Sequence, residues 1–212
     1  MKKYFIFILI SFFIVGIFDV KALNPLKNKV IVIDPGHGGI DPGTIYKDIY
    51  EKDLVLAISL YLKSELENKG ANVILTRNGD YDLSKPGAIY RKKSDFDNRI
   101  RIINDYADFY LSIHLNYLDD SQYSGIQVFS TKDNMLYANN VQNYLNKSLL
   151  SNRNSKIISS QIYMYQRLNK PGLLIECGFL SNEQERLKLI TNKYQKKVAK
   201  EIANAIFSLT IK

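Results

Sequence analysis

The chain contains two histidines, His37 and His114, and both come at the ends of predicted strands. His37 lies in the segment Asp-Pro-Gly-His-Gly-Gly at 34–39, and His114 lies in Ser-Ile-His-Leu-Asn at 112–116. Imidazole is the commonest protein ligand of zinc, and a catalytic zinc takes three protein ligands and leaves a position open for water. Either histidine alone could serve as a structural hydrogen-bonding group. Their shared placement at strand ends favours a metal site.

Two carboxylates could complete such a site. Glu51 opens a predicted helix and would lie over the same sheet edge as the histidines, although it could instead favour the helix N-terminus through the helix dipole. Glu176 interrupts the apolar run Leu-Leu-Ile-Glu-Cys-Gly at 173–178. A carboxylate buried among apolar residues needs a partner or a chemical purpose, so Glu176 is a candidate catalytic group.

Four further residues are candidates for supporting the chemistry. Asp34 precedes Pro35 and could shape a turn or orient a histidine. Arg77 and Arg99 could bring positive charge to a substrate or oxyanion, or form ion pairs within the structure. Asn116, two residues after His114, could contact substrate or support a ligand.

The glycines around His37 raise the alternative of a nucleotide-binding loop. The segment at 36–39 has neither the three-glycine spacing of a dinucleotide fingerprint nor the Gly-Lys-Ser/Thr of a P-loop. Because both patterns are missing, we exclude nucleotide binding at this loop.

Apolar β-branched runs alternate with segments of helical period, which predicts an α/β fold. We expect one domain with a mostly parallel, twisted sheet of about six strands and helices on both faces. Strands are predicted at 30–34, 71–76, 109–113, 126–130, 162–166 (an edge strand) and 173–177; helices at 51–68, 94–106 (opened by a Ser94–Asp97 capping pair), 134–150, 183–190 and 193–209. The ligand site of such a sheet lies at the carboxyl ends of its strands, where the candidate residues fall.

The first 22 residues differ from the rest of the chain. Lys2 and Lys3 precede an apolar run from 4 to 20, and Val-Lys-Ala at 20–22 offers small residues at the spacing of a cleavage site. Residues 1–22 are therefore predicted to be a signal peptide or an N-terminal anchor, and 23–212 a catalytic domain. The run is shorter than the roughly 20 residues of a spanning helix, which favours the signal peptide. We expect an exported protein.

Composition narrows the possible partners. The chain is 46% hydrophobic and 24% charged, which is typical of a globular protein. Residues 1–22 carry +2 of the net charge of +8, and the remaining +6 is spread without a basic run, so nucleic acid is not an expected partner. A mildly basic exported protein suits an anionic cell-wall polymer. The single cysteine, Cys177, cannot form an internal disulfide and is expected to fill the core.

Several segments, taken in order, resemble a known family: the zinc-dependent N-acetylmuramoyl-L-alanine amidases of the Amidase_3 type. The resemblance covers nearly everything after residue 22 and implies a phosphorylase/hydrolase-like fold. It rests on Val-Ile-Asp-Pro-Gly-His-Gly-Gly at 32–39, Glu-Lys-Asp-Leu at 51–54, Leu-Thr-Arg at 75–77, Arg99 with Asn104, Ser-Ile-His-Leu-Asn at 112–116 and Ile-Glu-Cys-Gly-Phe-Leu-Ser-Asn at 175–182.

The resemblance implies a site and a reaction. His37, Glu51 and His114 would hold one zinc ion per chain, and Glu176 would be the catalytic carboxylate. The substrate would be peptidoglycan, hydrolysed at the amide bond between the lactyl group of muramic acid and the L-alanine of the stem peptide. A zinc carboxypeptidase or peptidase acting on wall peptides, and a non-catalytic wall-binding protein, are the alternatives.

Within the family, the segments 91–99, 113–116 and 162–172 are most similar to the CwlD type of endospore formers. This similarity implies a role in forming muramic-δ-lactam in the spore cortex, a modification read during germination. It also implies a location in the cell envelope, in the space between forespore and mother cell. We expect no wall-binding module beside a catalytic domain at 23–212, and therefore expect that an accessory protein could provide activation or localisation.

Overall fold

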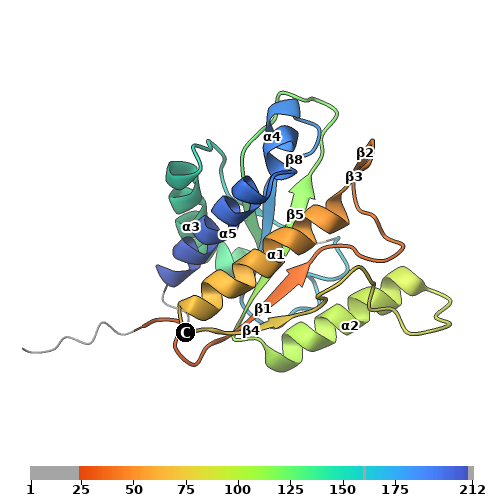
Figure 1. Cartoon of the computed structure of the whole chain (residues 1–212). Coiled ribbons are helices and arrows are strands. Elements are labelled where there is room, and N and C mark those ends of the chain that lie inside the picture. Colours follow the sequence, from red (N-terminus) through yellow and green to blue (C-terminus); the bar gives the residue numbers. More distant parts are fainter. Residues whose placement is uncertain (1–23, 160, 210–212) are drawn as a thin grey trace, which may run out of the picture.

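A six-stranded sheet in the order β4-β1-β5-β8-β6-β7 organises the computed structural model, which describes residues 24–159 and 161–209 (Figure 1). All neighbouring strands run parallel except β6 and β8, which are antiparallel. In chain order the elements are β1 (Val30–Pro35), β2 (Ile45–Tyr46), β3 (Ile49–Tyr50), α1 (Glu51–Asn68), β4 (Asn72–Leu75), α2 (Arg91–Tyr106), β5 (Phe109–Asn116), β6 (Gln127–Ser130), the 3₁₀ helix η1 (Lys132–Asn134), α3 (Met135–Ser148), β7 (Lys156–Ile157), β8 (Gly172–Phe179), α4 (Glu183–Leu189) and α5 (Asn192–Phe207). The predicted mostly parallel α/β sheet is confirmed.

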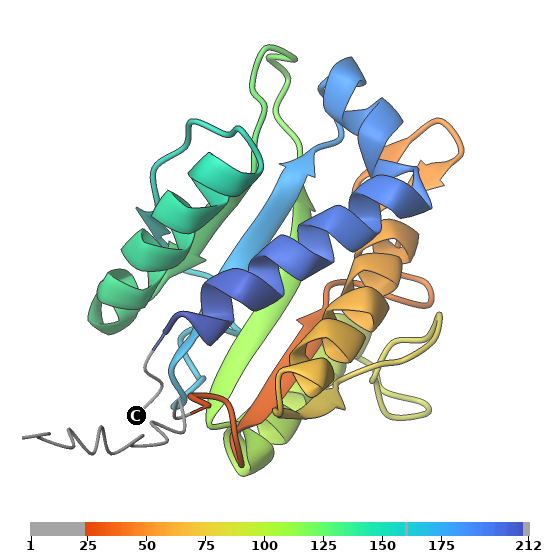
Figure 2. The same ribbon diagram turned by 60° about the vertical axis from the view of Figure 1, so that its left-hand side comes forward.

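Helices cover both faces of this sheet. Helices α1, α3 and α5 lie on one face and α2 lies on the other (Figures 1 and 2). The central strands β1, β5 and β8 are nearly continuous apolar runs because both of their faces are buried.

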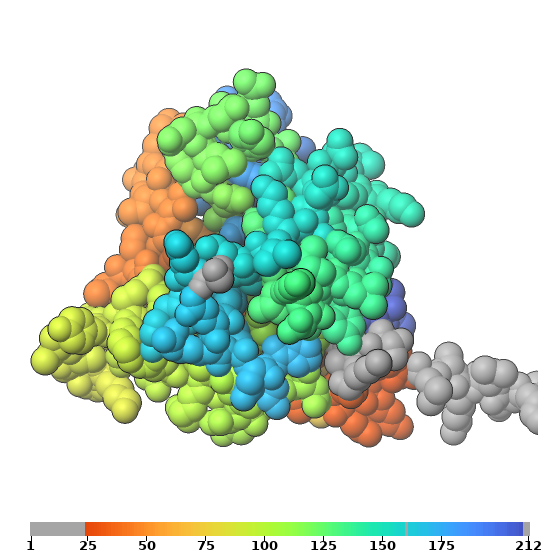
Figure 3. All heavy atoms as spheres, turned by 180° about the vertical axis from the view of Figure 1, so that it is seen from behind, coloured from red at the N-terminus to blue at the C-terminus, as the bar shows by residue number. Residues whose placement is uncertain are grey.

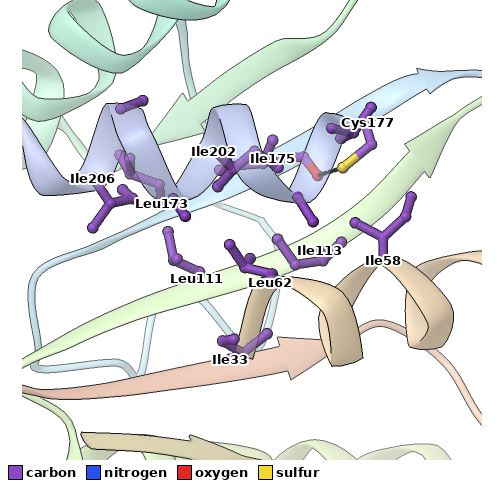
Figure 4. Close-up of a cluster of buried hydrophobic side chains, with 14 of the residues drawn as sticks. Ile33, Ile58, Leu62, Leu111, Ile113, Leu173, Ile175, Cys177, Ile202 and Ile206 are labelled. Carbon is purple, nitrogen blue, oxygen red and sulfur yellow. Dashed lines mark hydrogen bonds between the residues drawn. The ribbon is translucent and has the colours of Figure 1, made fainter. Parts of the chain in front are cut away.

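The larger apolar core lies between the sheet and α1, α3 and α5. Figure 4 shows part of it, where Ile58 and Leu62 of α1 and Ile202 of α5 pack over the strands. Cys177 is 1% exposed in this core, which confirms its predicted role as a buried apolar side chain. This packing holds the strands rigidly, so that side chains at their ends keep fixed positions.

On the opposite face, residues 155–159 and 161–171 lie between α2 and α3 (Figure 3). The predicted edge strand at 162–166 is wrong, because residues 163–167 form turns. A second, smaller apolar core lies on this face of the sheet. Met164 and Tyr165 are buried because they pack there against Val32 and Tyr110. The short strand β7 occupies the sheet edge instead.

The start of α2 also differs from its prediction. The helix begins at Arg91, and Ser94 lies within its first turn, so the capping pair with Asp97 is wrong. The Ser94 hydroxyl accepts a hydrogen bond from the backbone N–H of Lys85 and therefore fastens the preceding loop to the helix. The sequence pattern predicted that this hydroxyl would cap the helix, but it binds the backbone of the preceding loop instead.

The predicted signal segment at 1–22 lies outside the described residues. Within 24–159 and 161–209, no helix is both long and apolar enough to cross a membrane.

Candidate active site

The carboxyl ends of β1, β5 and β8 lie side by side, because these strands are parallel neighbours. His37 follows the end of β1, His114 lies near the end of β5, and Glu176 lies in β8 directly opposite His114. Partners in neighbouring strands are about 5 Å apart and point to the same face. The topology therefore brings together three residues separated by up to 139 positions in the sequence.

Glu51, the first residue of α1, joins this group. Its Oε1 lies 3.2 Å from Nε2 of His37 and 3.1 Å from Nδ1 of His114. The three ligand atoms of His37, Glu51 and His114 lie within 4.8 Å of one another, so these residues could hold a metal ion. Glu51 is itself fixed, because Oε1 accepts the N–H of Leu115 and Oε2 accepts that of Thr44.

Close backbone approach shapes the loop that carries His37. A Cβ at Gly36 would lie 2.2 Å from Cε1 of His114, and one at Gly43 would lie 2.7 Å from Glu51 Oε2. Only glycine leaves this space free. His37 itself has a φ of 61°, a left-handed conformation that is uncommon for a residue with a side chain. Such strain persists where the surrounding structure holds it in place.

Asp41 orients the His37 ring. Its Oδ2 lies 3.0 Å from Nδ1 of His37, leaving Nε2 to face Glu51 and His114. Burial opposes a charged ring, but the hydrogen bonds to Asp41 and Glu51 outweigh it and raise the pKa of His37 to about 9. A metal ion at Nε2 would compete with that proton.

Glu176 has a different environment. Its Oε2 is buried and has no hydrogen-bond partner among the described residues. Burial, with the Glu51 charge adding to it against the influence of the histidines, raises the pKa of the Glu176 carboxyl to about 7. The side chain can therefore exchange a proton near neutral pH.

Asp34 is the centre of a buried hydrogen-bond network. Its Oδ1 accepts from Thr76 Oγ1 at 2.6 Å and from Arg99 Nη1 at 2.8 Å, and its Oδ2 accepts from Ser112 Oγ at 3.1 Å. Tyr165 in turn donates to Ser112 Oγ at 3.0 Å. Asp34 thus links β1 to the end of β4, to α2 and to β5.

The two candidate arginines hold the backbone that carries His37. Arg99 donates to the carbonyls of Pro35 and His37, and Arg77 donates to those of Pro35 and Gly36. They are 2% and 1% exposed, respectively. Arg99 also forms ion pairs with Asp34 and Asp95, whereas the hydrogen bonds of Arg77 go to backbone carbonyls.

Asn116 lies at the end of β5, where its Oδ1 accepts the N–H of Tyr117. It does not line the hollow that contains the histidines. That hollow has a volume of about 200 Å³ and is lined by Asp34, Gly36, His37, Asp41, Lys92, Asp95, Phe96, Arg99, His114, Ile162, Met164, Tyr165, Leu174 and Glu176.

Sequence reasoning missed Asp41, Lys92 and Tyr165. A carboxylate four residues after His37 was a visible signal for Asp41. Lys92 and Tyr165 approach the site only through the packing of α2 and the segment 161–168, which no local pattern reveals.

Comparison with known proteins identifies the family. A family model described as N-acetylmuramoyl-L-alanine amidase (Amidase_3) matches residues 31–208. The chain is also 40% identical over 190 residues to the germination-specific N-acetylmuramoyl-L-alanine amidase of Bacillus subtilis, covering 86% of this chain and 80% of that protein. The chain belongs to the N-acetylmuramoyl-L-alanine amidase family.

Solved structures of this amidase family share the fold. The CwlD amidase of Clostridioides difficile, solved in complex with the GerS lipoprotein, is 40% identical and superposes with a TM-score of 0.79 over 84% of this chain and 96% of that one. An N-acetylmuramoyl-L-alanine amidase from Clostridium difficile 630 is 30% identical, with a TM-score of 0.75 over 86% and 96% of the two chains. The predicted amidase resemblance is confirmed at the level of the family and fold.

The ion pair between Asp34 and Arg99 makes the stability of the amidase domain sensitive to acid. Burial opposes ionisation, but Arg99 and the Thr76 hydroxyl outweigh it and lower the pKa of Asp34. Since its unfolded pKa is about 3.9, ionised Asp34 stabilises the fold above that pH, and this contribution is lost as the pH falls through the lower folded value. We expect Asp34→Asn to lower the free energy of unfolding by about 3 kcal/mol at pH 7, because Arg99 loses a buried charged partner.

The difference in the free energy of unfolding between Asp34→Asn and wild type should become smaller below about pH 4, where Asp34 begins to be protonated in the unfolded chain. Urea unfolding of both proteins between pH 3 and pH 7 measures this. Asp119→Asn, at an exposed loop position, is the control and should change the free energy by less than about 0.5 kcal/mol. A constant difference at every pH would refute the role of Asp34 ionisation.

Proposed function

We propose that this chain is a zinc-dependent N-acetylmuramoyl-L-alanine amidase that hydrolyses the bond between the lactyl group of muramic acid and the L-alanine of the stem peptide. One observation carries the proposal: in a chain of this family, the ligand atoms of His37, Glu51 and His114 converge within 4.8 Å at the sheet edge that also presents Glu176. The arrangement supplies three ligands and a separate proton-transfer group.

The donor set suits zinc. Two imidazole nitrogens and one carboxylate are a ligand combination of catalytic zinc sites, which keep a further position open. Asp41 supports His37 in the way that outer carboxylates commonly orient metal-binding histidines. The chemistry that zinc supplies when bound is polarisation of the substrate carbonyl and acidification of a water molecule.

Glu176 would carry out the proton transfers. Its carboxylate would accept a proton from the attacking water and return it to the alanine nitrogen as the amide bond breaks. A pKa near 7 balances these two tasks at neutral pH. A nearby dication would lower that pKa and so keep more of Glu176 ionised before the reaction.

The remaining residues would act by positioning. Asp41 fixes which nitrogen of His37 faces Glu51 and His114. Arg77 and Arg99 hold the backbone at 35–37, which includes the left-handed His37, through its carbonyls. Preorganisation of this kind reduces the reorganisation needed during the reaction.

The family relatives support a more specific role. The Bacillus subtilis relative is named germination-specific, and the Clostridioides difficile relative was solved with a lipoprotein. We propose that this chain is exported through its segment 1–22 and acts on spore peptidoglycan outside the cytoplasmic membrane, between forespore and mother cell. There it would prepare muramic acid for δ-lactam formation, with an accessory lipoprotein aiding its activation or localisation.

Metal analysis tests the ligand assignment. The purified full-length chain, supplied with zinc, should contain about one zinc per chain by elemental analysis. His37→Ala, His114→Ala and Glu51→Gln should each lose it, because every change removes a ligand. Glu67→Gln, an exposed change at the far end of the same helix, should retain the metal. A folded wild-type chain without zinc would contradict the assignment.

Substitution of Glu176 tests the reaction. Glu176→Gln should keep its zinc but release stem peptides from purified sacculi about 10² to 10⁴ times more slowly, because it cannot exchange the proton. Glu183→Gln, an exposed change in α4, is the control. Mass spectrometry should find intact peptides with new alanine amino termini. Loss of terminal amino acids would instead indicate a peptidase, and full activity in Glu176→Gln would rule out its proposed role.

The cortex tests the biological role. Spores of a strain that lacks this chain should contain cortex without muramic-δ-lactam, since its precursor would keep the peptide. Muropeptide analysis of purified spores measures the modification directly, and re-expression of the wild-type chain should restore it. Normal muramic-δ-lactam in the deletion strain would exclude this role while leaving the amidase reaction itself open to the sacculus assay.

A further inference from the structure

A second hollow adjoins the catalytic one. It has a volume of about 210 Å³, and the two hollows share Asp41, Lys92 and Asp95. Ile40, Pro42, Asp82 and Arg91 form the rest of its wall, where Arg91 forms an ion pair with Asp82. Lys92 therefore lies at the boundary between the hollow that contains Glu176 and this second hollow.

Among the described residues, Lys92 is the Lys or Arg side chain that lines both hollows. Its side chain is 54% exposed, and its Nζ contacts Oδ2 of Asp41 and lies 5.1 Å from the centre of the Phe96 ring. An ammonium group has three N–H donors, so the Asp41 contact leaves donors free. Among the described residues lining the catalytic hollow, the other Lys or Arg side chain is Arg99, which is buried and bound to Asp34, Asp95 and backbone carbonyls.

The chemistry of the substrate indicates which part would meet Lys92. The lactyl carboxyl is consumed in the scissile amide, so the muramoyl glycan has no charge there. The stem peptide carries the carboxylates. Its second residue is a glutamate joined onward through its side-chain carboxyl, so its α-carboxylate lies about 7 Å or less from the scissile nitrogen. Lys92 lies close to the metal-ligand cluster: its Nζ contacts the Asp41 carboxylate, which in turn contacts Nδ1 of His37.

We propose that Lys92 forms a carboxylate subsite that binds the free α-carboxylate of the second stem-peptide residue and so sets the direction in which the peptide leaves the catalytic hollow. The subsite rests on the amidase function proposed above. A charge-assisted hydrogen bond at a half-exposed position gives recognition of a carboxylate over its amide. The enzyme would thereby distinguish stem peptides with glutamate at the second position from those amidated there.

The test compares two substrates and three variants of the full-length zinc-loaded chain. The substrates are glycan fragments of equal length whose stem peptides differ only in having a free or an amidated α-carboxyl at the second residue. Wild type should cleave the free acid with a kcat/KM about tenfold higher. Lys92→Gln should bring the ratio close to one, mainly by raising KM for the acid, while Lys92→Arg should retain most of the preference.

Lys93→Gln is the matched control. Lys93 is the adjacent residue, is 58% exposed, and forms an ion pair with Asp97 away from both hollows, so this variant should keep the wild-type ratio. Equal cleavage of both substrates by wild type would overturn the subsite alone. An equal loss on both substrates in Lys92→Gln would also overturn it, because it would show that Lys92 acts through Asp41 and His37. Failure of wild type to cleave either substrate would overturn the proposed function and the subsite with it.

Discussion

The buried carboxylate of Asp34 is the contact on which the geometry of the site depends. It receives hydrogen bonds from Thr76, Arg99 and Ser112, which come from three different segments of the chain. Arg99 then continues from this carboxylate to the backbone of residues 35 and 37. A charge in this position is stable only because all of its partners are in place. Because Arg99 binds both Asp34 and the backbone carbonyls of Pro35 and His37, the ion pair also keeps the His37 loop in one conformation.

The site uses two glutamates for different tasks by giving them different surroundings. Burial opposes ionisation of both, but the contacts with His114 and His37 lower the pKa of Glu51, whereas Glu176 has few opposing interactions and its pKa rises to about 7. An ionised carboxylate suits a metal ligand, and one that titrates near neutrality suits proton transfer. This division follows from packing, since the two side chains are chemically the same.

Much of the architecture could be predicted because parallel strands buried on both faces have a distinctive pattern. The runs that became β1, β5 and β8 are apolar and rich in β-branched residues, and α1 ends near the expected glycine at position 70. The segment 162–166 misled the same reasoning. Met164 and Tyr165 pack onto the second core from a series of turns, whereas Ile162 is 39% exposed. A two-residue period in the sequence cannot distinguish that arrangement from an edge strand.

The sequence by itself determined the reactive residue types, their places at the ends of buried strands and the family to which they belong. Those are local properties, because strand pattern and side-chain chemistry are carried by neighbouring residues. The tertiary structure decided that Arg77 and Arg99 hold backbone, that Asp41 orients His37 and that Lys92 lies between two hollows. These roles depend on contacts between segments far apart in the chain, and such contacts exist only once the sheet, α2 and the loops have packed together.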